Sequence, residues 1–326
     1  MKYRNLGRSG IPVSEIGFGA WGIGGGWGTR DDAAALQSLE AALDAGVTFF
    51  DTAMGYGDGH SEELVGKAVR SRRENVVIAT KISPRTKRWP VLPRDPVSET
   101  FPGDWIVECT EASLRRLGVD RIDVQQLHAW TPGYLGQGDW LEALAKLKAQ
   151  GKVRAFGIST NDWDPYGAVG LIESGLIDSV QVIYNIFDQR PQERLLPAAI
   201  EHGVGIIVRV PFEEGLLTGA FGPDHRFEEG DWRGQWLTPE RLAEAAARVE
   251  KLGGFLTADR PTPAALALKF CLSHPAVSTV IPGMRSPKHV AANTAVSDGI
   301  PLTDAEVQAL AAHRFVHGWA YPWAQK

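Results

Sequence analysis

The feature that most constrains the fold of this chain is an alternation of short apolar runs with helical segments from one end to the other. Eight runs rich in β-branched or aromatic residues are only four to seven residues long, as is typical of strands buried on both faces. The predicted strands are Ile16–Gly19, Val47–Asp51, Val76–Lys81, Ile122–His128, Val153–Ser159, Ser179–Tyr184, Val204–Val210 and Ser278–Ile281. Eight β/α units in 326 residues fit a (β/α)8 barrel better than an open, doubly wound sheet.

The segments between these strands carry helical patterns and helix boundary signals. A capping-box signal at Thr29-Arg-Asp-Asp32 predicts the start of the first helix, and Ala45-Gly46 its end. The other predicted helices are Ser61–Val69, Asp104–Leu117, Trp140–Gln150, Pro165–Ser174, Glu193–Glu201, Pro263–Ser273 and Pro287–Ala295, with an extra helix at Thr238–Leu252. Lys2–Leu6 and Pro12–Glu15 predict a β-hairpin that plugs the N-terminal end of the barrel. No linker interrupts residues 1–326, so we expect a single domain.

Composition excludes several classes of protein. The net charge of −5 and the pI near 5.9 give little attraction for nucleic acid or an anionic membrane. No apolar run reaches the roughly 18 residues that a membrane span needs, and the first residues lack a signal-peptide core. Cys109 and Cys271 are too few for a disulfide framework or a cysteine zinc site. We therefore expect a cytoplasmic protein without a metal, and the sequence is compatible with a monomer and with a homo-oligomer.

Four polar residues come at or just after predicted strand ends, where barrel active sites lie. Asp51, Lys81 and His128 end strands two, three and four, and Tyr56 follows in a glycine-rich loop. Each alone has an ordinary structural role as a cap, a solvated strand end or a packing residue. Together, a carboxylate, an ammonium, a phenol and an imidazole form an acid–base device. A free Tyr has a pKa of about 10, and we expect Lys81 to lower it for proton donation.

The chain resembles the aldo-keto reductases over nearly its whole length. The resemblance rests on an ordered set of motifs: Phe50-Asp-Thr-Ala53, Asp51 through Tyr56, Ser61-Glu-Glu-Leu-Val-Gly66, Ala79-Thr-Lys81, Gln126-Leu-His128, Gly151-Lys-Val-Arg-Ala-Phe-Gly-Ile-Ser159, Gln181-Val-Ile-Tyr-Asn185, Gly215-Leu-Leu-Thr-Gly219 and Ile281-Pro-Gly283 through Asn293. It implies a barrel that binds extended NADPH without a metal and transfers hydride to an aldehyde or ketone. In that reading Tyr56 is the general acid, and Asp51, Lys81 and His128 are its partners.

The residue types at other strand ends indicate which positions could contact the cofactor. Ser159, Gln181 and Asn161 could orient the nicotinamide carboxamide, with loop capping as the alternative role. Backbone N–H groups of Gly215-Leu-Leu-Thr-Gly219 could bind a pyrophosphate. Cations beside the start of the last helix suit a 2′-phosphate, or form a solvated helix start. The expected cofactor-binding residues are Gly19, Trp21, Asp51, Ser159, Asn161, Gln181, Arg209, Pro211, Gly215, Leu216, Gly283, Arg285, Lys288, His289 and Asn293.

Several residues depart from the common family pattern. Arg209 stands where an aromatic residue usually stacks on the nicotinamide, and Thr160 replaces the usual Asn after Ser159. Gly283-Met-Arg285 replaces a frequent Lys-Ser, which moves the expected phosphate contact to Arg285 or Lys288. Gly17-Phe-Gly-Ala-Trp-Gly22 matches a dinucleotide-binding motif, but no helix begins at its third glycine. We interpret it as the first β/α loop, with Trp21 and Trp27 near the cofactor and substrate.

The loop aromatics favour a small carbonyl or sugar substrate. The expected pocket is lined by Trp21, Tyr56, Trp89, His128 and Trp130, although such aromatics also serve as loop anchors. The first functional hypothesis is an NADP(H)-dependent carbonyl reductase. The alternatives are an aldose dehydrogenase that uses the same four residues, and a non-enzymatic NADP-binding regulatory subunit like the potassium-channel β subunits.

Overall fold

The computed structural model describes residues 1–25, 30–162, 164–319 and 321. Its centre is a parallel eight-stranded sheet in the order β10-β9-β8-β7-β6-β5-β4-β3, and β1 and β2 form a separate antiparallel pair. The strands are β1 (Tyr3–Asn5), β2 (Pro12–Ser14), β3 (Phe18–Gly19), β4 (Phe49–Asp51), β5 (Val77–Ile82), β6 (Ile122–Leu127), β7 (Val153–Ser159), β8 (Ser179–Ile183), β9 (Gly205–Arg209) and β10 (Val277–Val280). Parallel bridges Ile16–Val280 and Gly19–Gly283 join the first strand to the last. The predicted (β/α)8 barrel is therefore confirmed.

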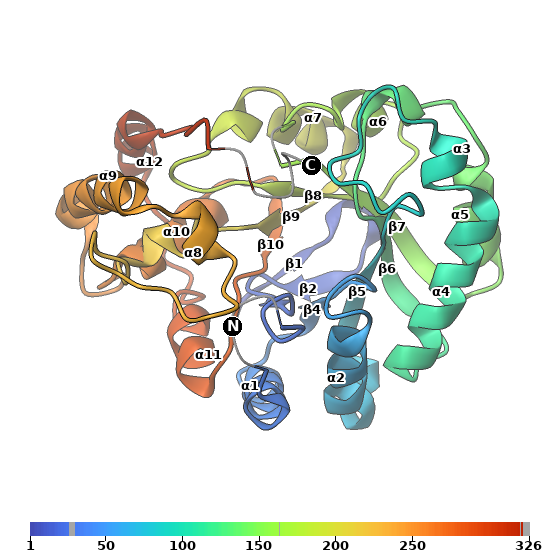
Figure 1. Cartoon of the computed structure of the whole chain (residues 1–326), viewed down its shortest axis with the longest axis horizontal. Helices are drawn as coiled ribbons and strands as arrows, with labels where there is room; N and C mark the ends of the chain where they lie inside the picture. Colours follow the sequence, from blue (N-terminus) through green and yellow to red (C-terminus); the bar gives the residue numbers. More distant parts are fainter. Residues whose placement is uncertain (26–29, 163, 320, 322–326) are drawn as a thin grey trace.

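Helices surround the strands, as Figure 1 shows. They are α1 (Asp32–Asp44), α2 (His60–Val69), α3 (Val97–Thr100), α4 (Gly103–Leu117), α5 (Trp140–Ala149), α6 (Val169–Glu173), α7 (Leu195–His202), α8 (Arg233–Trp236), α9 (Pro239–Glu250), α10 (Pro263–Ser273), α11 (Pro287–Thr294) and α12 (Asp304–Leu310). The short helices α3 and α8 belong to the long segments that follow β5 and β9. These segments rise from the C-terminal ends of the strands, where they can shape a pocket.

The start of α1 follows the predicted signal, whereas the start of α6 does not. Asp31, the third residue of the Thr29-Arg-Asp-Asp32 signal, caps α1, because its carboxylate accepts a hydrogen bond from the Ala34 N–H at 2.9 Å. Thr29 itself lies outside the described residues. The helix predicted from Pro165 begins only at Val169. The chain first turns there, and the Asp164 carboxylate accepts from the Tyr166 N–H, as Asp often does before a helix.

Apolar side chains fill the N-terminal end of the barrel interior. Leu6, Ile11 and Val13 of the predicted hairpin are buried in one cluster with Phe49, Val77, Ala79, Val124, Ala155, Ile207 and Ile281. Because side chains alternate along a strand, every second residue of β5 faces this interior. The apolar plug ends with Ala79, and the next inward residue on β5 is Lys81. The same alternation brings Asp51 of β4 inward after Phe49.

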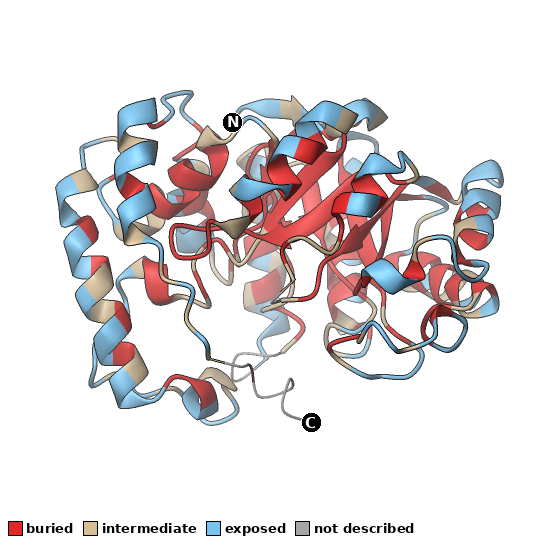
Figure 2. Ribbon diagram, turned by 90° about the horizontal axis from the view of Figure 1, so that it is seen from above, coloured by how far each residue is buried: buried red, intermediate tan, exposed pale blue. Residues whose placement is uncertain are grey.

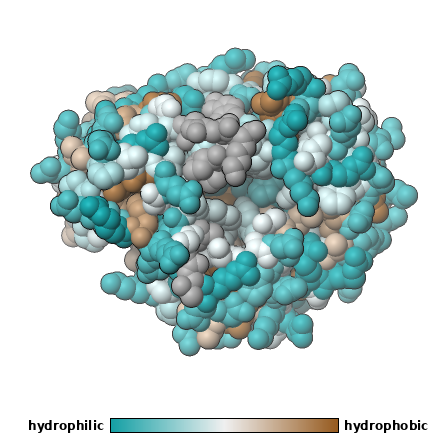
Figure 3. Space-filling model, in the orientation of Figure 1, coloured by the Kyte–Doolittle hydropathy of each residue, from teal (hydrophilic) through white to brown (hydrophobic). Residues whose placement is uncertain are grey.

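Burial follows this arrangement. The strands are almost wholly buried, whereas most helices are buried along one side and exposed along the other (Figure 2). The face in Figure 3, apart from its grey atoms, is mostly hydrophilic, with small separate hydrophobic patches. Among the described residues, no helix has both the length and the apolar character needed to cross a membrane.

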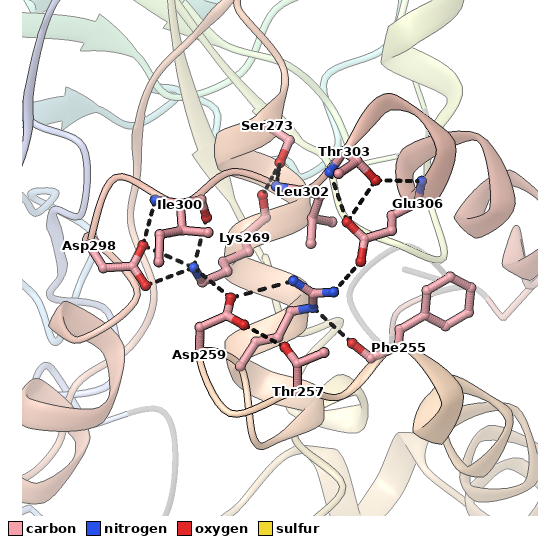
Figure 4. A network of polar contacts seen from close by, with 11 residues as sticks. Phe255, Thr257, Asp259, Lys269, Ser273, Asp298, Ile300, Leu302, Thr303 and Glu306 are labelled. Atoms are coloured by element: carbon pink, nitrogen blue, oxygen red, sulfur yellow. Dashed lines mark hydrogen bonds and ion pairs between the residues drawn. The ribbon is translucent and has the colours of Figure 1, made fainter.

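A charged network attaches the C-terminal segment to α10 (Figure 4). The Lys269 ammonium lies 2.8 Å from the Asp298 carboxylate, donates to the Ile300 carbonyl and pairs with Asp259. Next to it, Arg260 pairs with Glu306 of α12. The side chains of Lys269 and Arg260 are only 1% and 7% exposed, so the network holds the chain firmly where it leaves the barrel and turns back towards the loop after β9.

Candidate active site

Strand register explains why three of the four predicted residues converge. Phe49–Asp51 pairs with Val77–Ala79, and Lys81 lies beside Gln126. His128 directly follows β6, and its N–H donates to the Ile82 carbonyl at 2.9 Å. Neighbouring parallel strands end at the same rim of a barrel. Asp51, Lys81 and His128 therefore meet at one place, as their positions in the sequence predict.

Lys81 is the centre of the site. Its Nζ lies 2.5 Å from Asp51 Oδ2, 2.8 Å from the Thr52 carbonyl oxygen and 3.0 Å from Tyr56 Oη. The ammonium also lies 4.7 Å from the centre of the Tyr56 ring. The Lys81 and Asp51 side chains are 0% and 2% exposed. A phenol, an ammonium and a carboxylate are thus linked in a chain, and its ammonium and carboxylate are screened from water.

The electrostatics of this chain differ in one respect from the prediction. Burial raises the pKa of Tyr56 more than Lys81 lowers it, so the net pKa is above the ordinary value of 10.0. For Lys81, burial lowers the pKa, but attraction to Asp51 and Tyr56 outweighs it and the net pKa is raised. The phenol therefore keeps its proton in the free protein beside a charged ammonium.

His128 is kept neutral beside the phenol. Burial, followed by the positive charges of Lys81 and Arg209, lowers its pKa well below the ordinary 6.5. Its ring lies edge-on to the Tyr56 ring, with 5.5 Å between centroids. A neutral imidazole carries one N–H donor, so His128 can donate a hydrogen bond without transferring a proton.

Two glycines fix the turn that carries Tyr56. A Cβ on Gly24, in the loop after β3, would lie 2.9 Å from the Tyr56 carbonyl carbon. Gly57 has φ +64°, and a Cβ on it would lie 2.2 Å from the Gly24 oxygen. The first loop therefore presses its bare backbone against the turn of Tyr56, and neither glycine leaves room for a methyl group.

Trp89 lies beside His128, and Trp21 lies in the loop after β3. The Trp89 ring is edge-on to His128 at 5.0 Å, and the Trp21 ring is edge-on to Trp232 at 6.1 Å. Both tryptophans are partly exposed, as pocket walls require. Trp27 lies outside the described residues.

Trp130 has a different place from the predicted one. Its side chain is buried with 1% exposure, and its ring packs edge-on against Tyr134 and Trp140. Its Nε1 donates to the Gly167 carbonyl at 3.2 Å. Trp130 anchors the loop after β6 against α5, so we leave it out of the proposed pocket.

Three buried polar side chains lie at or near the C-terminal ends of β7 and β8. Ser159 and Gln181 are register neighbours, and Gln181 Nε2 donates to Asp51 Oδ1 at 2.8 Å. Asn161 Nδ2 donates to the carbonyls of Val91 and Trp130. Its Oδ1 is buried without a hydrogen-bond partner. A buried orphan acceptor is costly, so this oxygen is suited to accept from a ligand N–H.

Arg209 ends β9 and enters an ion pair that the sequence analysis did not foresee. Its Nη2 lies 2.7 Å from Asp162 Oδ1 and 3.1 Å from the Thr160 carbonyl. The chain after it is irregular: Val210 has φ +54°, and the buried Pro211 follows. A charged residue three positions beyond the end of β7 is the sequence signal that could have revealed Asp162.

The loop at Gly215 and Leu216 is placed near the rim, but its N–H groups are used within the loop. The N–H groups of Gly215 and Leu216 donate to the carbonyls of Phe212 and Glu213, both at 3.0 Å. A Cβ on Gly215 would lie 2.7 Å from the Phe221 ring, so that ring covers the loop. The predicted donation from these two N–H groups to a pyrophosphate is therefore not supported.

Gly19 and Gly283 close the barrel. They form a parallel bridge, and a Cβ on Gly19 would lie 2.5 Å from the Ile281 oxygen. Their small size is explained by this close backbone contact. Arg285 and Lys288 follow at the start of α11, which Ser286 caps. Burial and these two cations lower the pKa of His289, so the three basic groups lie together, and the buried Asn293 is on the same helix.

Comparison with known proteins agrees with this geometry. The model of the "Aldo/keto reductase family" matches residues 15–314. The chain belongs to the aldo/keto reductase family. It is 31% identical to the NADH-specific methylglyoxal reductase of Escherichia coli (strain K12), over 94% of this chain and 96% of that protein.

Two solved structures also resemble it. The holo form of aldo-keto reductase AKR11C1 from Bacillus halodurans has a TM-score of 0.77 and 30% identity, with both chains fully covered. The glycerol dehydrogenase AKR11B4 from Gluconobacter oxydans has a TM-score of 0.79 and 28% identity, covering 95% of this chain and 94% of that one.

The site residues fit the nicotinamide cofactors that this oxidoreductase family uses. The orphaned Asn161 Oδ1 suits a carboxamide N–H, and Gln181, whose Nε2 is engaged by Asp51, can turn its Oε1 to the same group. Within the described part of the chain, Arg285 and Lys288 have no acidic partner within ion-pair distance. Cations left unpaired at a helix start are suited to a phosphate.

Two contributors to this site were not selected from the sequence. The Thr52 carbonyl accepts from Lys81, and a backbone oxygen leaves no signal in a sequence. Gln126 Nε2 lies 3.4 Å from Asp51 Oδ1. It stands inside the Gln126-Leu-His128 motif, and its inward position two residues before His128 is the signal that could have identified it.

Proposed function

We propose that this protein is an NADP(H)-dependent oxidoreductase that reduces aldehydes or ketones to alcohols, with Tyr56 as the general acid. The chain of close contacts from Asp51 through Lys81 to Tyr56 Oη, beside a neutral His128, is the observation that carries this proposal. It is a proton-donating arrangement at the rim of a barrel in which all four groups share one space.

The reaction can be derived from these side chains. A bound reduced nicotinamide supplies the hydride. The Tyr56 hydroxyl donates a hydrogen bond to the carbonyl oxygen, and the neutral His128 ring donates a second. As negative charge develops on that oxygen, Tyr56 transfers its proton. Lys81, 3.0 Å away, stabilises the phenolate that remains, and Asp51 keeps Lys81 charged and oriented.

Dihydronicotinamide absorbance tests the proposal directly. We expect the absorbance to fall when an aromatic aldehyde is added with NADPH, since Trp21 and Trp89 offer aromatic walls. NADH is tested in parallel. Binding of both cofactors without turnover of any aldehyde, ketone or sugar would contradict the proposal.

A second candidate is oxidation of an alcohol or aldose at the same four residues. The similarity to a solved glycerol dehydrogenase favours including it. Microscopic reversibility then makes Tyr56, as phenolate, the base. Incubating the protein with NADP⁺ and glycerol or an aldose, and following the appearance of NADPH, distinguishes the two directions.

The preference for NADPH is tested at Arg285. We expect Arg285→Ala to weaken NADPH binding by about 10–100-fold, because a hydrogen bond to a charged group contributes about 1.5–3 kcal/mol. NADH, which lacks the 2′-phosphate, should bind with nearly unchanged affinity. Both dissociation constants are measured by fluorescence titration, with Lys67→Ala on α2 as a control. Equal weakening of the two cofactors would contradict the role of Arg285.

The neutral state of His128 predicts the acid side of the pH profile. Since its pKa is lowered well below 6.5, His128 stays neutral as the pH falls from 7 to 6. We expect no loss of the carbonyl reduction rate over this interval, measured as kcat at saturating substrate. An inflection near pH 6.5 that disappears in His128→Asn would contradict this prediction.

A further inference from the structure

Arg209 adds a second, largely buried cation to the site. It ends β9, and its side chain is 16% exposed. Its charge acts on both groups that are proposed to bind the carbonyl oxygen. The pKa of His128 is lowered by burial most, then by Lys81 and then by Arg209. The pKa of Tyr56 is raised, mainly by burial, and Arg209 acts in the opposite direction. The guanidinium therefore lies within electrostatic range of the place where the carbonyl reacts.

Asp162 balances this cation. Its Oδ1 is 2.7 Å from Arg209 Nη2, its Oδ2 is 3.5 Å from Trp89 Nε1, and its side chain is 7% exposed. The carboxyl groups of Glu213 and Glu214, in the loop after β9, are paired or neutral. Glu213 pairs with His317 and accepts from Asn185. Burial and then Glu213 raise the pKa of Glu214 to about 8, so Glu214 is largely protonated at pH 7.

The position of the hydride donor follows from the proposed chemistry. The donor carbon must contact the carbonyl carbon, whose oxygen is held by Tyr56 and His128. The nicotinamide ring therefore also lies within electrostatic range of Arg209, whichever path the rest of the cofactor takes. The oxidised ring carries one positive charge and the reduced ring carries none, so a fixed charge nearby acts on the two forms differently.

We propose that the Arg209–Asp162 ion pair sets the ratio of the affinities for oxidised and reduced cofactor, because Asp162 cancels the repulsion between the Arg209 guanidinium and the oxidised ring. This inference rests on the proposed function. It makes Asp162 a positioning and charge-balancing residue that bears on the direction of the reaction. An uncompensated Arg209 favours the reduced form, and an uncompensated Asp162 favours the oxidised form.

The test is the dissociation constant of NADP⁺ divided by that of NADPH, measured by quenching of tryptophan fluorescence. We expect Asp162→Asn to raise this ratio about tenfold or more, as for unit charges about 7 Å apart at an effective dielectric constant of about 20. Arg209→Met should lower it. The double variant should return it to within about threefold of the wild-type value. If the protein prefers the unphosphorylated cofactor, NAD⁺ and NADH replace this pair of probes.

The control removes a similar ion pair from the other end of the barrel. Arg73 Nη2 lies 2.8 Å from Asp123 Oδ2 at the start of β6, and Arg73→Met should leave the ratio unchanged.

Circular dichroism and the Tm show whether each variant is folded. An unchanged ratio in Asp162→Asn, or shifts of the same sign in both single variants, would overturn the inference. If one of these results is found while the wild-type protein reduces carbonyls and Tyr56→Phe does not, the inference fails and the proposed function stands. If wild type binds neither form, the proposed function fails with it.

Discussion

Tyr56→Phe is expected to lower the turnover number for carbonyl reduction by about 100-fold or more. General acid catalysis contributes about 10²–10⁴-fold, and Phe removes the hydroxyl that lies 3.0 Å from Lys81 Nζ while keeping the ring. Because the ring remains, its edge-on contact with His128 and the shape of the pocket are retained. The dissociation constant of NADPH should therefore stay within about twofold of the wild-type value. Turnover is measured from absorbance, and binding from fluorescence titration.

Tyr3→Phe is the matched control for this experiment. It removes a phenol hydroxyl from the hairpin, where Tyr3 Oη donates to the Gly46 carbonyl at 3.0 Å on the surface. It should leave turnover unchanged. If Tyr56→Phe retains more than about a tenth of the wild-type rate, Tyr56 is not the general acid. If both turnover and cofactor binding collapse together, the ring has a structural role that outweighs its acid role.

Lys81→Met is expected to destabilise the fold by about 3–5 kcal/mol. Removing one partner of a buried ion pair leaves the other charge uncompensated, and Asp51 is only 2% exposed. The double variant Asp51→Asn/Lys81→Met should recover part of this loss, because it buries no charge. Urea denaturation of the cofactor-free protein gives the change in the free energy of unfolding.

Activity separates this effect from a purely structural one. All three variants, including Asp51→Asn alone, should lose most of their turnover, whereas only the single variants should be strongly destabilised. Wild-type stability in Lys81→Met would show that Asp51 is not held by this pair. Full activity in the stabilised double variant would show that the pair serves the fold and not the chemistry.

The sequence was most informative where a residue's place depends on strand periodicity. Asp51, Lys81 and His128 could be brought together from the sequence because each comes at the end of a buried strand, and parallel strands end at one rim. The hairpin plug was predictable for a similar reason, since Leu6 and Val13 are apolar residues beside a tight turn. The family motifs then added Tyr56, which stands in a loop.

Loop packing was much less predictable. Trp130 and Trp89 both follow strands and have the same chemistry, but Trp130 is buried against α5 and Trp89 lies beside His128. The sequence does not say which loop folds over which. The same limit applies to Gly215, whose N–H donates within its own loop. Lys81 lowers the pKa of Tyr56, as expected, but burial, a property of the folded chain, raises that pKa by more.

The close contact of Gly24 with the turn of Tyr56 bears on how the specificity of this protein can be redesigned. Libraries aimed at new substrates would naturally randomise the first loop, since Trp21 is in it. At Gly24 even Ala would push on the backbone of Tyr56, the proposed acid, so we expect such variants to lose rate before they gain selectivity. Mutational searches are better directed to Trp21 and Trp89, whose side chains can change while the backbone of that turn remains in place.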